Sequence, residues 1–316
     1  MNRLNNRLDG RSLRGFLLLT LLAASILPQV DGRQSRRNVF AAVAASLQQP
    51  KFHLDCSLPT LTTKPLAIDK SCPNTGMPSS DASSKQNEIK NRFCLPGTPT
   101  TPIDLDFATF DTLQREAVQR HIPFGRRNLP NSNKSEEVLP PDRSVLVDFI
   151  TDGQGRKLGE GSLVRLEGFV LNAQHSNTFV FSEQGESVNC NKTSLAENDI
   201  HIELVQTAAE TSQCKSVTAE IIPHHRSAIY NQFDTNPKDY LNGQRQKRGQ
   251  DKLSGSPPPL KGARVRVTGQ LFFDASHSPC GINQGGSSQR RSIWEIHPVY
   301  AIDVFDTAQN MFVPLK

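Results

Sequence analysis

Residues 161–168, GSLVRLEG, and residues 262–269, GARVRVTG, share one pattern: a short run of alternating apolar and polar side chains that ends in glycine. Further apolar residues follow each glycine, so each strand is expected to continue beyond it. Glycine tolerates the bulge or kink that a strand needs at the corner of a small barrel. We therefore expect two sharply bent strands, which are typical of a small β-barrel.

Short apolar or alternating runs between clusters of Gly, Asn and Ser predict the remaining strands. The expected strands are Ser144–Ile150, Leu163–Ala173, Asp199–Leu204, Ser216–Ile222, Arg264–Phe273 and Ile293–Phe305. Five or six short strands, the first of them bent, predict a mainly β fold with an OB-like barrel of curled antiparallel strands around one apolar core. A β-sandwich is the alternative.

The chain before the barrel has a different composition. It is rich in Pro, Ser and Thr, which is typical of loops, and apolar side chains at helical spacing predict one amphipathic helix over Asp106–Arg120, capped by Asp111 or Thr112. A proline-rich stretch then predicts a linker. We divide the chain into a signal peptide, a Cys/Pro-rich and partly helical region, and an OB-like barrel domain with a long exposed insertion loop. These parts are residues 1–32, 33–143 and 144–316, and the loop covers residues 223–262.

The first residues have the order of a secretory signal, with four arginines before the apolar run Phe16–Leu27. A helix that crosses a bilayer needs roughly 20 apolar residues, and this run is shorter. We therefore expect a cleaved signal peptide, a secreted or periplasmic protein, and no membrane-spanning segment after cleavage.

All six cysteines follow the predicted signal peptide, and an oxidising compartment favours their pairing in three disulfides. They are Cys56, Cys72, Cys94, Cys190, Cys214 and Cys280. Three of them precede residue 100 and three follow residue 189, so full pairing requires at least one bridge between the two parts. The spacing leaves the connectivity open, and the sequence contains no C-x-x-C motif of the kind that binds zinc.

Alternation along two predicted strands places Asp199, His201, Glu295 and His297 on the face opposite the apolar side chains. Glu220, from the segment between these strands, is the fifth possible metal ligand. If their strands are neighbours, the imidazoles and carboxylates form a cluster suited to Zn²⁺ or Mn²⁺, which could activate water for hydrolysis. The alternative is that these side chains form the solvated face of the strands. Proline after His297 also predicts a bulge or a strand end there.

OB barrels bind oligonucleotides or oligosaccharides on aromatic and basic surfaces, which makes Arg165, Arg264, Arg266 and Trp294 candidate binding residues. The alternative is that the arginines form a solvated face and that Trp294, the only tryptophan, fills the core with its indole N–H bonded to backbone. The formal net charge is +5, of which about +3 lies beyond residue 32, a weak argument for a nucleic-acid partner.

Several strings resemble those of a family of uncharacterised exported bacterial proteins. They are GESVNC (185–190), NDIHI (198–202), SVTAEI (216–221) and WEIHPV (294–299), and the resemblance covers most of residues 50–305. It implies a β domain similar to OB-fold proteins of the nucleic-acid-binding type. Because likeness of fold supports a fold better than a ligand, it supplies no catalytic residue.

Together these observations predict an exported, disulfide-stabilised OB-like binding module rather than an enzyme, with no cofactor. Its ligand stays open among polysaccharide, nucleic acid and protein. The alternative is a metal-dependent hydrolase that uses Zn²⁺ or Mn²⁺ at His201, Glu220, Glu295 and His297. A third possibility is a structural partner in an envelope complex. The sequence has no Gly-x-Ser-x-Gly motif to indicate a serine nucleophile.

Overall fold

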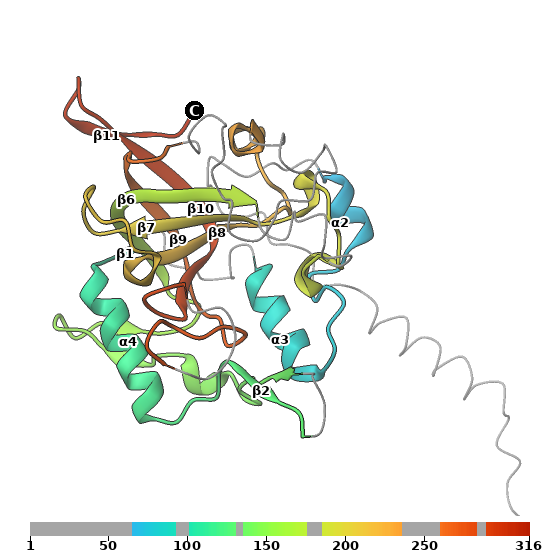
Figure 1. The fold of residues 1–316 in the computed structure, drawn as a ribbon. Helices are drawn as coiled ribbons and strands as arrows, with labels where there is room; N and C mark the ends of the chain where they lie inside the picture. Colours follow the sequence, from blue (N-terminus) through green and yellow to red (C-terminus); the bar gives the residue numbers. More distant parts are fainter. Residues whose placement is uncertain (1–64, 93–100, 131–134, 176–184, 236–259, 283–288) are drawn as a thin grey trace, which may run out of the picture. The chain divides into compact units, whose positions relative to one another are not determined.

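The computed structural model describes six stretches of the chain, all of them within one compact unit, Gln49–Lys316 (Figure 1). The stretches are residues 65–92, 101–130, 135–175, 185–235, 260–282 and 289–316. The predicted signal peptide, Cys56, Cys94 and most of the predicted insertion loop lie outside the described residues.

Five strands form a closed barrel: β6 (Leu163–His175), β7 (Ile200–Val205), β8 (Val217–Ile221), β9 (Arg264–Phe273) and β10 (Trp294–Asp306). Their order is β6-β7-β8-β10-β9, and β9 pairs back with β6 to close the ring. Since β8 and β10 are parallel and the other pairs are antiparallel, the barrel is mixed and not wholly antiparallel as expected. Closure of the sheet also removes the β-sandwich alternative.

Shorter elements extend and surround the barrel. Strand β1 (Ile103–Leu105) is parallel to β6, and β11 (Met311–Pro314) is antiparallel to β10. Two small ladders pair β2 (Arg126–Asn128) with β3 (Ser135–Glu137) and β4 (Ile150–Thr151) with β5 (Lys157–Leu158). The 3₁₀ helices are η1 (Ser144–Leu146), η2 (Ser187–Asn189), η3 (Leu195–Glu197), η4 (Gln213–Lys215) and η5 (Ala228–Thr235).

Five of the six expected strands are confirmed, and the first, Ser144–Ile150, is wrong. Its residues form η1 and lead into the two-residue strand β4. The side chain of Asp142 accepts a hydrogen bond from the Ser144 N–H at 2.9 Å, which favours a turn over a strand. Leu146 and Phe149, three residues apart, are both buried, as suits a turn rather than a period of two.

The glycine at each strand bend lies close to another part of the backbone. A Cβ atom at Gly269 would lie 2.4 Å from the carbonyl oxygen of Pro298. At this place the register of β10 against β9 shifts between Ile296 and Val299, which is the bulge that the proline predicts. A Cβ atom at Gly168 would lie 3.0 Å from the carbonyl oxygen of Val205. The two glycines therefore permit the close approaches that small barrels need.

The expected amphipathic helix is α4 (Phe107–Gln119), whose apolar face belongs to the same core as the barrel interior. Its N-cap is Asp106, whose carboxylate accepts a hydrogen bond from the Thr109 N–H at 2.8 Å, so the predicted caps are wrong. Asp111, one of them, forms an ion pair with Arg291 instead. The helix lies across one end of the barrel (Figure 1).

Two disulfides lie among the described residues, Cys72–Cys190 and Cys214–Cys280. The first joins the region before the barrel to the barrel, as the cysteine distribution requires. Helices α2 (Ala67–Ser71) and α3 (Asp81–Lys90) belong to that region. Among the described residues, no helix combines the length and apolar character needed to cross a membrane.

Candidate metal centre

The outward face of β8 and β10 is buried, and the end of α3 packs on the adjoining outer face of β9. Gln270 on β9 donates hydrogen bonds to the carbonyl oxygens of Ile89 at 3.1 Å and His297 at 3.0 Å, which ties the end of α3 to β9 and β10. Glu295 and His297 point outward from the barrel, opposite the core residue Trp294, as the alternation predicts. The alternative of a solvated strand face is wrong for these two residues, since both are fully buried.

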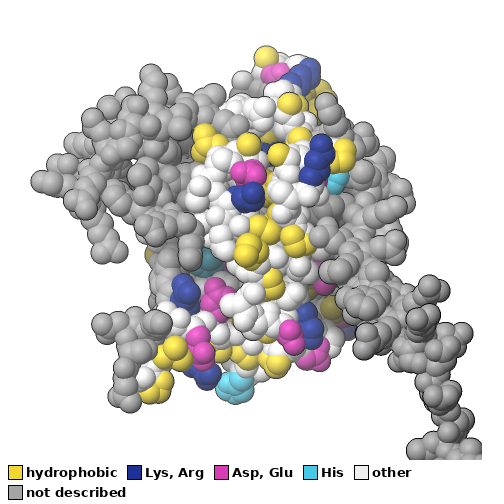
Figure 2. All heavy atoms as spheres, turned by 90° about the vertical axis from the view of Figure 1, so that its right-hand side faces the viewer, with side chains coloured by type: hydrophobic (Ala, Val, Ile, Leu, Met, Phe, Trp, Pro, Cys, Tyr) yellow, Lys and Arg dark blue, Asp and Glu magenta, His cyan; other side chains and the backbone are white. Residues whose placement is uncertain are grey.

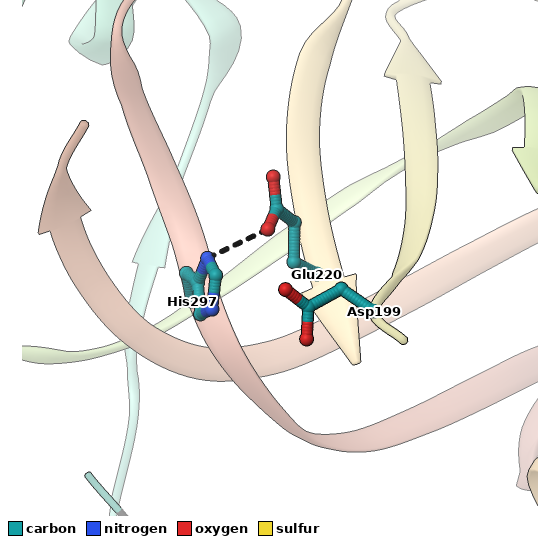
Figure 3. Close-up of side chains that lie close together, drawn as sticks. All are labelled: Asp199, Glu220 and His297. Atoms are coloured by element: carbon teal, nitrogen blue, oxygen red, sulfur yellow. Dashed lines mark ion pairs between the residues drawn. The ribbon is translucent and has the colours of Figure 1, made fainter. Parts of the chain in front are cut away.

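Strand register brings three of the predicted ligands together. Asp199 immediately precedes β7, Glu220 is opposite His201 in the β7–β8 ladder, and Ile296 is opposite Ala219 in the β8–β10 pair, which places His297 beside Glu220. One ligand atom from each of Asp199, Glu220 and His297 lies within 4.8 Å of the others. We name these three residues the first cluster. Figure 3 shows both carboxylates directed toward the imidazole of His297.

The other two predicted ligands contact the first cluster. His201 Nε2 lies 3.2 Å from Glu220 Oε1, and Glu295 Oε2 lies 3.6 Å from His297 Nδ1. The His201 side chain is 23 % exposed, so it lies between the buried cluster and solvent. Glu186, from the segment before η2, lies 3.8 Å from the same His201 nitrogen. All five sequence-predicted residues are therefore contiguous.

Several polar atoms of the first cluster are buried without hydrogen-bond partners. Both carboxylate oxygens of Asp199 and both ring nitrogens of His297 have none among the described residues, although these side chains are 0 % exposed. His297 Nδ1 lies 2.9 Å from Glu220 Oε2, but the two atoms do not have hydrogen-bond geometry. Since buried polar groups in folded proteins are nearly always partnered, these atoms require an explanation.

The electrostatics of the first cluster differ from one residue to the next. Burial, reinforced by the negative charge of Glu186, raises the pKa of Asp199 well above its usual value. Burial also opposes ionisation of Glu220, but the positive fields of His201 and His297 outweigh it and lower its pKa well below the usual value. Burial opposes protonation of His297, and Glu220 outweighs it and raises the pKa to about 10.

A second cluster lies next to the first and was missed by the sequence reasoning. Ligand atoms of Asp274, His277 and Glu295 lie within 4.8 Å of one another. Arg290 is 3.3 Å from Asp274 Oδ2 and forms an ion pair with Glu295, and Lys90 Nζ lies 3.9 Å from Asp274. Asp274 and His277 follow the end of β9, outside the strand alternation that identified the other ligands. The FFDASH string (residues 272–277) was the available signal.

The candidate binding residues lie elsewhere. Arg165 pairs with Asp104 at 2.6 Å, Arg264 pairs with Glu167, and Arg266 lies 3.4 Å from Asp303. Each of these arginines therefore has a carboxylate partner on the barrel or on β1.

Trp294 is fully buried in the core, where its ring is 5.2 Å from Phe149 and 5.1 Å from Phe273. It is therefore unavailable at the surface. Its indole N–H lacks the expected backbone partner among the described residues.

Comparison with known proteins gives no match: no protein-family model, no curated protein and no solved structure is similar enough to this chain to be reported. The family resemblance of the strings above stays a prediction. The chemistry of the site must be interpreted from its own geometry.

Proposed function

We propose that this chain is an exported, disulfide-stabilised OB-like module that binds its ligand on the β7–β8 face, at the part where His201 and Glu203 of β7 are partly exposed. The observation that carries the proposal is the strand order. The first barrel strand, β6, pairs with both the second, β7, and the fourth, β9, and the third and fifth, β8 and β10, are parallel. This connectivity supports the OB-like assignment, a five-stranded barrel whose second and third strands commonly carry the ligand.

The charge of the β7–β8 face narrows the ligand class. On this face His201 and Glu203 are partly exposed, whereas Asp199 and Glu220 are buried. Because Glu186 and Glu203 accompany the single histidine, the accessible part of the face offers little attraction to a polyanion, which disfavours nucleic acid and favours a neutral ligand. Figure 2 also shows charges of both signs mixed over the described part of one side of the molecule, rather than one basic patch. Polysaccharide is the ligand class that we propose.

The proposal that the protein is exported rests on two features. The first 32 residues have the composition of a signal peptide. The disulfides Cys72–Cys190 and Cys214–Cys280 suit an oxidising compartment, where such bonds persist. Secretion or a periplasmic location is therefore part of the same proposal.

The test is binding by the oxidised mature protein to an array of uncharged oligosaccharides and to a labelled single-stranded DNA oligonucleotide. We expect saturable oligosaccharide binding, weakened at least about tenfold by Glu203→Lys on the β7–β8 face, and no binding of the DNA. The matched control is Glu167→Lys on the outer side of β6, where the pair with Arg264 is exposed. DNA binding, the absence of any oligosaccharide ligand, or equal losses in the two variants would contradict the proposal.

A metal-dependent hydrolase is the second candidate, because the five predicted ligands are contiguous and His201 is partly exposed. A metal ion with an open position can lower the pKa of a bound water and so supply hydroxide. This candidate requires that the first cluster binds a metal, so it falls if none binds. Unlike the binding module, the hydrolase would catalyse hydrolysis of its substrate, and a chelator would abolish this activity.

A further inference from the structure

We infer that Asp199, Glu220 and His297 form a binding site for one divalent transition-metal ion. This inference goes beyond the proposed function and does not depend on it, because it rests on the three side chains and not on the barrel's resemblance to a fold. The barrel nevertheless explains how the site is assembled. Each ligand comes from a different part of the chain, and the β7–β8 and β8–β10 pairings hold them together.

The unpartnered oxygens of Asp199 distinguish this site from an ordinary acidic cluster. The side chain is 0 % exposed and is directed toward the other two ligands (Figure 3). A buried carboxylate without a hydrogen bond or a cation is strongly unfavourable. A metal ion bound between the three side chains supplies the missing partner for Asp199 and for a free nitrogen of His297 at the same time.

A proton is the competing explanation for Asp199. A protonated carboxyl group would have to donate its O–H to an acceptor, and the acceptors within 4.8 Å include atoms of Glu220 and His297. Protonation could therefore partner one oxygen of Asp199 at most, and it leaves the other oxygen and at least one ring nitrogen of His297 without a hydrogen bond among the described residues. A metal ion between the three side chains gives Asp199 and His297 a partner and neutralises the carboxylate at the same time.

The second cluster shows how the protein neutralises buried carboxylates with its own cations. Asp274 and Glu295 share Arg290, and Lys90 lies 3.9 Å from Asp274. In the first cluster, no arginine or lysine forms an ion pair with Asp199 or Glu220 among the described residues, and Lys90 acts on these two carboxylates only from a distance. The first cluster is therefore the one that needs an external cation.

The donor set indicates the class of metal. One imidazole with two carboxylates suits Zn²⁺, Mn²⁺ or Fe²⁺, whereas Ca²⁺ and Mg²⁺ prefer oxygen ligands alone. Glu295 lies 3.6 Å from His297 Nδ1 and is placed to orient the ring as an outer-sphere partner. His201 contacts Glu220 in a similar way from the solvent side.

The test is isothermal titration of the chelator-treated, oxidised full chain with ZnCl₂, and separately with MnCl₂, together with elemental analysis. We expect one equivalent of metal in the wild type. Asp199→Asn, which preserves shape, should weaken binding by more than about 100-fold, and Glu295→Gln, which removes an outer-sphere partner, by about 10- to 100-fold. The matched control is His277→Gln in the second cluster, which should bind metal as the wild type does.

Circular dichroism first establishes that each variant is folded, and Glu220→Gln replaces Asp199→Asn if that variant is not. Failure of the folded wild type to bind either metal would overturn the inference. So would full affinity in the folded Asp199→Asn variant, or loss of metal in His277→Gln, which would place the ion in the second cluster. Oligosaccharide binding is a separate measurement, so failure of the metal site and failure of the proposed function can be told apart.

Discussion

The first and second clusters lie side by side between the barrel wall and the segments packed on it, and they balance their charges differently. In the second cluster, Arg290 pairs with Asp274 and with Glu295, so each buried carboxylate has a cation from the chain itself. In the first cluster, Asp199 has no such partner among the described residues. The second cluster is therefore neutralised by the chain itself, whereas the first is where we propose that a metal ion binds.

Opposite pKa shifts express the same contrast. Burial opposes ionisation of both Asp199 and Asp274. For Asp274, the nearby His277, Lys90 and Arg290 outweigh burial and lower the pKa well below its usual value. For Asp199, Glu186 adds to the effect of burial and the pKa rises. His297 and Lys90 also act on Asp199, but they do not outweigh burial, so two aspartates with equal burial shift in opposite directions.

The largest effect is expected from Arg290→Met. Removing the guanidinium leaves Asp274 and Glu295 buried without their main cation, and breaking a buried ion pair in this way costs about 3–5 kcal/mol. Denaturant unfolding of the oxidised protein measures the loss. The control is Arg127→Met, whose exposed pair with Glu136 contributes about 0–1 kcal/mol. Similar losses in the two variants would mean that the second cluster does not stabilise the fold.

A smaller difference in the free energy of unfolding, but a more direct test of the contrast, is expected between Asp199→Asn and Asp274→Asn in chelator-treated protein. The first substitution removes a buried charge that has no ion-pair partner, so the free energy of unfolding should stay the same or rise. The second removes a paired charge and should lower it by about 3 kcal/mol or more. Both are measured by the same denaturant titration. Equal losses would erase the distinction between the clusters.

The smallest expected effect concerns how the stability of the protein depends on pH in acid. Because folding lowers the pKa of Asp274 below the usual value of 3.8, the unfolded state binds this proton more readily than the folded state. The stabilisation from this group is therefore complete above about pH 4 and is lost as the pH falls toward the folded-state pKa, at about 1.4 kcal/mol for each unit of difference. Stability of Asp274→Asn measured against pH should fall less steeply below pH 4 than that of the wild type. An unchanged slope would contradict the assignment.

The strands could be predicted from the sequence because alternation and turn residues are local signals. The predicted strand Arg264–Phe273 matches β9 to the residue. Gly269 also correctly marks the place where β9 approaches Pro298 closely. The prediction of a strand over Ser144–Ile150 failed because the capping side chain of Asp142 and the three-residue spacing of the buried apolar residues favour a turn over a strand. The second cluster was missed because Asp274 and His277 follow a strand and show no periodicity.

By itself, the sequence determined which side chains of β7, β8 and β10 face away from the apolar core, because alternate residues of a strand point to opposite faces. It also determined that, if all six cysteines pair, at least one disulfide must join the two parts of the chain. Only the tertiary structure decided that the outward face is buried. Strand pairing made neighbours of Asp199, Glu220 and His297, and the packing of other segments on the barrel buried them. A charged side chain needs a partner once it is buried. Burial depends on contacts between segments that are distant in the sequence, and no local pattern encodes those contacts.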